Sequence, residues 1–143
     1  MIYFDSSALV KRYVQEEGSD QVNALLKEGS IPVVSRLAYP EILAALTRRH
    51  KAGEIETTAF ERIKKAFKAD WASIAVVEIH KEIFQFIDEV IAKHALKGAD
   101  SIHLSTALWL NKAAKQDVVF VASDLELLKA ARAEKLGIYN PGR

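Results

Sequence analysis

The amino-acid sequence predicts an α/β fold in which a mainly parallel sheet is flanked by helices on both faces. Short runs of β-branched and aromatic residues alternate along the chain with longer stretches of helical periodicity. The short runs are apolar at consecutive positions, as expected for strands that are buried on both faces. Strands that alternate with helices favour a parallel sheet with helices packed on its two sides.

Three runs are the strongest strand candidates, namely IYF at 2–4, IPVV at 31–34 and VVFVA at 118–122. Two weaker candidates are SIAVVEI at 73–79 and GIYN at 137–140. Helices are indicated between them by apolar stripes at helical spacing, which lie within 22–26, 42–46, 83–91 and 102–110. The stripe at 83–91 predicts one long amphipathic helix. Because no repeat, low-complexity tract or linker divides the chain, residues 1–143 are expected to form one domain.

The composition excludes several classes of protein. The chain has no cysteine, so neither disulfides nor thiolate metal sites are possible. Its net charge of +1 gives no overall basic field for nucleic acid, although a local basic patch would suffice. No leader pattern is present, and no apolar run approaches the roughly 18 residues of a membrane-spanning helix. A soluble, cytoplasmic protein without membrane contact is therefore expected.

Four carboxylates stand where predicted helices begin. Asp5 follows the first strand, Glu41 is the second residue of a helix opened by a proline, Asp100 starts another helix, and Asp124 follows the strand at 118–122. Acids are favoured at helix N-termini in any case, so capping explains each of them singly. Capping gives no reason for them to converge, whereas a parallel sheet directs such turns toward one cleft at the carboxyl ends of its strands.

Carboxylates gathered in one cleft would repel one another, and a divalent cation would remove that repulsion. Mg²⁺ and Mn²⁺ prefer oxygen ligands, and carboxylates are the best metal ligands that this chain offers. Such a site suits phosphodiester hydrolysis. One ion lowers the pKa of a water molecule there, and a second ion about 3.5–4 Å away stabilises the leaving oxygen.

Three polar residues near the acids have both a structural and a functional interpretation. Ser7 and Ser123 could hydrogen-bond a carboxylate, a metal-bound water or a phosphate, but serine is also typical of helix caps. Ser123 and the glutamate three residues later match a capping box. His103 lies one turn after Asp100, where it could be a ligand, a proton shuttle or a buried histidine with a structural partner.

Two arginines follow Glu41 on the same predicted helix. Arg48 lies seven residues later, about two turns along the same face, and Arg49 is its neighbour. They could contact an RNA phosphate or balance the acids. Cations are also favoured at a helix C-terminus, so both interpretations stay open.

The segments FDSSALVKRY, SRLAYPEILAALTRR, LKGADSIHLSTAL and VVFVASDLELLKAA resemble, in order and spacing, the four acidic motifs of PIN-domain ribonucleases. The sequence is most similar to the VapC-type toxins of VapBC toxin–antitoxin pairs, and the resemblance extends from Met1 to the terminal LGIYNPG. It implies a five-stranded parallel sheet. It also implies that Asp5, Glu41, Asp100 and Asp124 bind Mg²⁺ or Mn²⁺ and that the substrate is single-stranded or looped RNA.

The resemblance further implies a small antitoxin protein whose tail occupies the acidic cleft, and it favours a homodimer. One residue departs from the family pattern, because Pro40 stands where a small or aliphatic residue is expected, and this could alter how Glu41 is presented. Two alternatives keep the fold: an RNA-processing or decay nuclease without an antitoxin, and a non-catalytic RNA-binding or interaction module. A phosphatase of the haloacid-dehalogenase type is disfavoured, because Ser7 occupies the position of its second aspartate.

Overall fold

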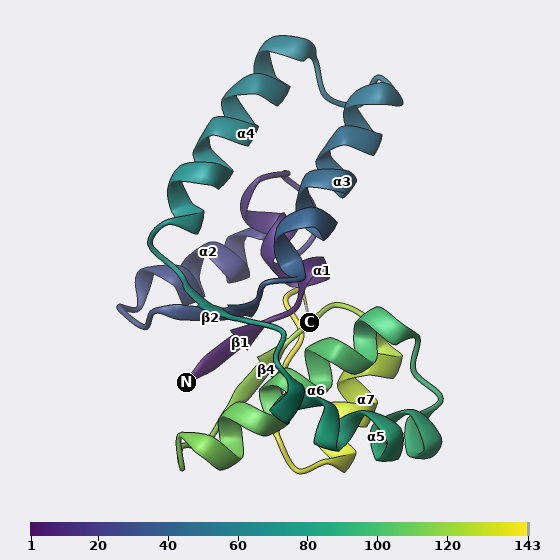
Figure 1. Ribbon diagram of the computed structural model, residues 1–143. Helices are drawn as coiled ribbons and strands as arrows, with labels where there is room; N and C mark the ends of the chain where they lie inside the picture. The colour runs from purple at the N-terminus through teal and green to yellow at the C-terminus, as the bar shows by residue number, and fades with distance from the viewer. Residues whose placement is uncertain (143) are drawn as a thin grey trace.

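The computed structural model describes residues 1–142, which form a five-stranded sheet between two layers of helices (Figure 1). The strand order is β3-β2-β1-β4-β5, and every neighbouring pair is parallel. The strands are β1 (Ile2–Phe4), β2 (Pro32–Ser35), β3 (Ala75–Val77), β4 (Val119–Val121) and β5 (Gly137–Tyr139). The predicted fold class and the parallel sheet are confirmed.

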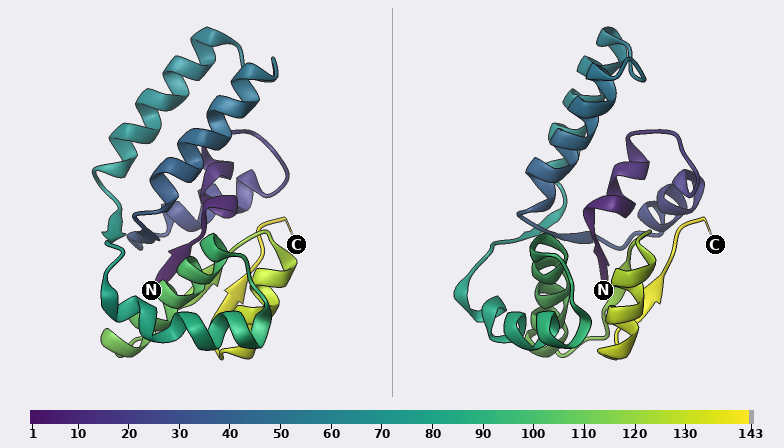
Figure 2. Two further views of the ribbon diagram at one scale, coloured as in Figure 1. Left: turned by 45° about the vertical axis from the view of Figure 1, so that its right-hand side comes forward. Right: turned by 90° about the vertical axis from the view of Figure 1, so that its right-hand side faces the viewer.

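Helices connect the strands and cover both faces of the sheet (Figures 1 and 2). Before β3 the chain forms α1 (Ser6–Leu9), the 3-10 helix η1 (Val10–Arg12), α2 (Ser19–Lys27), α3 (Ala38–Lys51) and α4 (Thr57–Trp71). After β3 it forms the 3-10 helix η2 (Lys81–Phe86), α5 (Ile87–His94), α6 (Gly98–Ala113) and α7 (Leu125–Ala133). None of the helices within residues 1–142 is long and apolar enough to cross a membrane.

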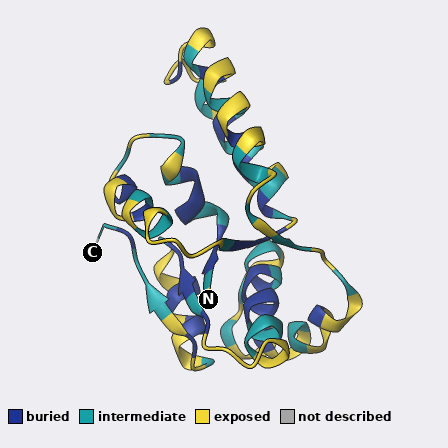
Figure 3. Ribbon diagram, turned by 90° about the vertical axis from the view of Figure 1, so that its left-hand side faces the viewer, coloured by how far each residue is buried: buried dark blue, intermediate teal, exposed yellow. Residues whose placement is uncertain are grey.

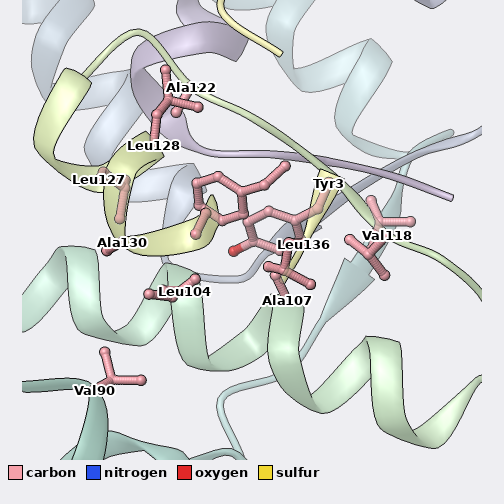
Figure 4. Packing of buried hydrophobic residues seen from close by; sticks show 13 residues of the cluster. Tyr3, Val90, Leu104, Ala107, Val118, Ala122, Leu127, Leu128, Ala130 and Leu136 are labelled. Atoms are coloured by element: carbon pink, nitrogen blue, oxygen red, sulfur yellow. The ribbon is translucent and has the colours of Figure 1, made fainter. Parts of the chain in front are cut away.

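Alternate strand residues divide the hydrophobic core into two layers, because successive side chains of a strand point to opposite faces. Tyr3 and Phe120 belong to the layer under α5, α6 and α7, where their rings stack with centroids 5.3 Å apart (Figure 4). Phe4 and Val121, the next residue of each strand, belong to the layer under α1 to α4. Both layers are therefore built by the same consecutive apolar residues that predicted the strands.

Helices α3 and α4 form a hairpin that projects beyond the sheet (Figure 2). Its base is held by the buried ring of Phe67, which contacts Tyr13, Tyr39 and Trp71. Exposed residues run along one side of the hairpin up to its tip (Figure 3). The hairpin thus carries one end of α3 into the core and leaves the other end in solvent.

Two predictions about helices are wrong in detail. The single helix predicted around 83–91 is divided into η2 and α5. In η2 the i,i+3 pair consists of Ile83, which is fully buried, and Phe86, which packs against the core, and this spacing suits the three-residue turn of a 3-10 helix. Helix α3 begins at Ala38, so Glu41 is its fourth residue and not its second. Pro40 is accommodated within the first turn, where a helix needs no N–H donor.

Candidate active site

Asp5 lies directly after β1, at the point where the sheet meets the N-terminus of α1. Its backbone N–H donates to the carbonyl of Val121 across the β1–β4 pair, at 3.0 Å. Its side chain is only 4% exposed and caps α1 by accepting from the N–H of Ala8 at 3.1 Å. The Ser7 hydroxyl lies 2.8 and 3.0 Å from the two carboxylate oxygens and donates to them. Asp5 is therefore a helix cap, as its position in the sequence suggested, and is also fixed at the carboxyl edge of the sheet.

Glu41 of α3 is held by side chains from two other elements. The Ser6 hydroxyl donates to its Oε1 at 2.6 Å, and Nε2 of His103 lies 2.6 Å from the same oxygen. On the other side of the ring, Nδ1 of His103 lies 2.8 Å from the hydroxyl of Tyr3, and both residues are buried. The result is a continuous relay from the core through Tyr3 and His103 to Glu41.

The relay keeps Glu41 ionised. Partial burial raises the pKa of this carboxyl, but the hydrogen bonds from His103 and Ser6 outweigh it and hold the pKa below its usual value. Because a carboxylate only accepts, Nε2 is the protonated ring nitrogen and Nδ1 accepts from Tyr3 when the ring is neutral. His103 is therefore a buried histidine with hydrogen-bond partners, which is the structural interpretation that its position left open, and through one of these bonds it orients Glu41.

Asp100, the third residue of α6, lies within electrostatic reach of the other acids. Burial raises its pKa, and the charges of Asp124 and Glu41 raise it further. Burial also raises the pKa of Asp5 to about 6, with a smaller contribution from Asp100. Each of the other three predicted acids therefore interacts electrostatically with Asp100.

Asp124 caps α7, since its Oδ1 accepts from the N–H groups of Glu126 and Leu127 at 2.9 and 3.1 Å. The capping box predicted for Ser123 is therefore wrong, because the helix begins one residue later than that motif requires. The backbone N–H of Ser123 donates instead to the Ser7 hydroxyl at 3.2 Å, and its own Oγ is buried without a partner among residues 1–142.

Two residues of the site were not singled out from the sequence. Ser6, which bonds Glu41, directly follows Asp5, and Tyr3, which bonds His103, precedes it by two residues on the same strand. The period-two alternation of a strand could have indicated Tyr3, because residues 3 and 5 share a face. The arginines lie apart from this network: Arg49 pairs with Glu16 at 2.6 Å, and Arg48 is exposed on α3. Their contact with RNA stays a prediction.

The donor atoms of the site suit a hard divalent cation. They are oxygens, which are the ligands that such ions prefer. The charges of Asp124 and Glu41 raise the pKa of Asp100 because like charges repel, and a bound cation would relieve that repulsion. Within residues 1–142, however, no three acidic or histidine side chains form a group that could hold an ion as they stand. Glu41 is turned toward His103, and Asp124 is engaged by the backbone of α7. The metal site therefore stays a prediction, with suitable ligands but with side chains that must reorient.

The fold and the converging acids define a class of protein, and comparison with known families identifies it. The PIN domain family model matches residues 2–133, and the chain belongs to the PIN-domain family. It is 40% identical over 111 residues to Ribonuclease VapC45 of Mycobacterium tuberculosis (strain CDC 1551 / Oshkosh), an alignment that covers 76% of this chain and 75% of that protein. Identity and coverage are the same for Ribonuclease VapC49 of Mycobacterium tuberculosis (strain ATCC 25618 / H37Rv). The resemblance seen in the motifs is confirmed.

Solved structures agree with the fold. The complex of FitAB with an IR36 DNA fragment contains a chain that matches with a TM-score of 0.71 at 13% identity, covering 100% of this chain and 96% of that chain. VapBC2 from Rickettsia felis, bound to a promoter DNA fragment, matches with a TM-score of 0.67 at 15% identity and 98% coverage of both chains. At these identities the similarity concerns the fold alone.

Replacing Asp5 by asparagine should stabilise the protein at neutral pH. A carboxyl whose pKa rises from 3.8 to about 6 on folding binds its proton more tightly in the native state. Its ionisation therefore lowers the free energy of unfolding as pH rises from about 4 through about 6, at a cost of about 3 kcal/mol by pH 7. Urea unfolding in chelator should show Asp5→Asn more stable than wild type at pH 7, with a gain that shrinks toward pH 4.5. Asp117→Asn in an exposed loop is the control, and a gain independent of pH would contradict this account.

Replacing Tyr3 by phenylalanine should disturb His103 and Glu41. The change leaves Nδ1 of a buried imidazole without a donor, which costs about 1–3 kcal/mol. The ¹⁵N chemical shifts of the His103 ring should move away from those of a single Nε2-protonated tautomer. The matched control is Tyr139→Phe, which removes the hydroxyl of a partly buried tyrosine on β5. Unchanged ring shifts in Tyr3→Phe would show that the relay does not form.

Proposed function

We propose that this protein is a divalent-metal-dependent endoribonuclease that cleaves single-stranded or looped RNA and is the toxin of a type II toxin–antitoxin pair. The main support is that four acids of a PIN-domain chain influence one another electrostatically at the carboxyl edge of the sheet, namely Asp5, Glu41, Asp100 and Asp124. The relatives named Ribonuclease VapC support the activity. The toxin role is supported by the neighbouring VapBC2 and FitAB structures.

The four carboxylates would hold Mg²⁺ or Mn²⁺, which would neutralise them and stabilise the negative charge that develops on the phosphate. Without such neutralisation the acids would repel the RNA backbone. Ser7 and the Ala8 N–H keep Asp5 in place, while Ser6 and His103 do the same for Glu41. Because its pKa is held below the usual value, Glu41 stays ionised and would be available as a charged ligand for the metal.

Burial of the site favours a flexible substrate. Asp5 is almost completely removed from solvent, so a phosphate must be presented deep between α1, α3 and α6. An RNA single strand or loop can splay its nucleotides and bring one phosphate into such a site, whereas a regular duplex holds its backbone on a rigid cylinder.

An acidic site of this kind can be silenced by arginine. A guanidinium stays charged at any physiological pH and can bind carboxylates through two parallel hydrogen bonds. A small antitoxin that inserts one arginine near Asp5 and Asp100 would neutralise the site and compete with the metal. The homodimer expected from the sequence stays a prediction.

Cleavage should require both the metal and Asp100. On a mixed RNA pool, wild type should be active with Mg²⁺ or Mn²⁺ and inactive in chelator, and Asp100→Asn should lose roughly 100-fold or more of its rate. The same ions should raise the melting temperature of wild type but not of Asp100→Asn, because the variant lacks a charged ligand. Asp117→Asn should behave as wild type in both assays. Undiminished cleavage in chelator would refute metal dependence.

A gene encoded beside this one should supply the antitoxin. Expression of this chain alone should slow growth, and co-expression of the neighbouring small protein should restore it. Replacing the inserted arginine of that partner by alanine should abolish the rescue. If wild type cleaves RNA in vitro but is harmless when expressed alone, the processing-nuclease alternative is favoured.

A further inference from the structure

A cavity of about 230 Å³ adjoins the acidic site and is not accounted for by it. It lies where η1, the loop before α2, the N-terminus of α7 and the segment after β5 meet. Its lining residues are Lys11, Glu17, Ser123, Leu125, Asn140 and Pro141.

The cavity and the acidic site share one stretch of chain. The N–H of Ser123 donates to the Ser7 hydroxyl at 3.2 Å, and this hydroxyl is 2.8 Å from Asp5. Asp124 stands between the two lining residues Ser123 and Leu125. A molecule in the cavity is therefore a neighbour of any phosphate that the acids engage.

The walls of the cavity are held together closely. Gly18, at a φ of +94°, lies so close to Pro141 that a Cβ atom would be only 3.0 Å from it. Gly142 lies equally near Glu17, with 3.1 Å between its hypothetical Cβ and Cγ of the glutamate. Lys11 secures the same loop, since its Nζ donates to the carbonyl of Glu17 at 2.7 Å. The segment after β5 runs beside the loop before α2 in both views of Figure 2.

The lining combines a polar edge with an apolar surface. Asn140 offers N–H donors, and Lys11 has one N–H beyond those that bond Glu16 at 3.2 Å and the carbonyl of Glu17 at 2.7 Å. Glu17 offers a carboxylate acceptor. Leu125 is 53% exposed although it is a large apolar residue, and the packing of α7 does not require it there. The volume is below the roughly 300–1,000 Å³ of sites for drug-sized ligands. A flat ring system with a hydrogen-bonding edge, such as one nucleobase, fits this combination.

We propose that the cavity receives a guanine base of the RNA substrate, next to the phosphate that is cleaved; this rests on the proposed ribonuclease function. The two oxygens of Glu17 accept from N1–H and from the N2 amino group of guanine. Lys11 or Asn140 donates to O6, and Leu125 covers one face of the ring. Recognition of an unstacked base along its Watson–Crick edge is typical of proteins that bind single-stranded RNA.

The carboxylate selects guanine among the four bases. Guanine alone presents two adjacent N–H donors beside a carbonyl acceptor. Adenine and cytosine place an acceptor nitrogen beside their amino group, which would face the carboxylate of Glu17 and repel it. Uracil has a single N–H between two carbonyl oxygens, so one carboxylate oxygen would lack a donor.

The first test measures binding without catalysis. The full-length protein in chelator is titrated with GMP, AMP, CMP and UMP and followed by NMR. GMP should bind at least about fivefold more tightly than the other three nucleotides. Glu17→Gln and Asn140→Ala should remove that preference, and Glu89→Gln, at an exposed position on α5, should retain it. Equal binding of the four nucleotides, or a preference that survives Glu17→Gln, would overturn the proposal.

The second test maps the ends of RNA fragments cut from a mixed pool. Wild type should show guanine enriched at one position beside the cut. Glu17→Gln should flatten that enrichment, whereas Glu89→Gln, on the exposed side of α5, should keep both the enrichment and the wild-type rate. Cleavage without base preference at any position would overturn the assignment of the cavity to a guanine base, but it would leave the proposed ribonuclease function intact. Selective GMP binding by a protein that cuts no RNA would support a guanine site in the cavity and refute the proposed ribonuclease function.

Discussion

The structure depends on keeping an ionisable carboxylate, Asp5, almost completely out of water at the edge of a parallel sheet. Burial is the largest cause of the rise in its pKa to about 6, so the fold carries an electrostatic cost at neutral pH. The Ser7 hydroxyl and the Ala8 N–H at the start of α1 offset part of that cost. Such a cost is typical of a functional site, where the chemistry of a group is favoured over its contribution to stability.

The site is joined to the core through a polar relay. Tyr3 lies among the hydrophobic residues of the layer under α6 (Figure 4), where its ring stacks on that of Phe120. Its hydroxyl hydrogen-bonds His103, which in turn orients Glu41. The position of a carboxylate on α3 is thus determined by aromatic packing on the opposite face of the sheet. Since the interior of a protein is close-packed, small changes in that layer would be felt at the acids.

If the protein has the proposed activity, the acidic site and the cavity next to it have different functions. In that activity the carboxylates would act on a phosphate, and the cavity bounded by Lys11, Glu17 and Leu125 would select the adjoining base. Arg49 is engaged with Glu16, in the loop that leads to Glu17, so the α3–α4 hairpin is tied to the wall of that cavity. Base selection and cleavage would then be coupled through a few short contacts.

The sequence by itself determined the parallel α/β fold, the helix starts at Asp5 and Asp124 and the four acids, because apolar periodicity and capping preferences act over a few neighbouring residues. It left open whether His103 is a ligand, a proton shuttle or a buried histidine with a partner, and it assigned to Ser123 a cap that Asp124 provides. It also missed Ser6 and Tyr3 as partners of Glu41 and His103. These partners are separated by 35 and 100 positions along the chain. Only the packing of α3 against α1, and of α6 against the layer that contains Tyr3, brings them within hydrogen-bonding distance, so only the tertiary structure could decide what each side chain does.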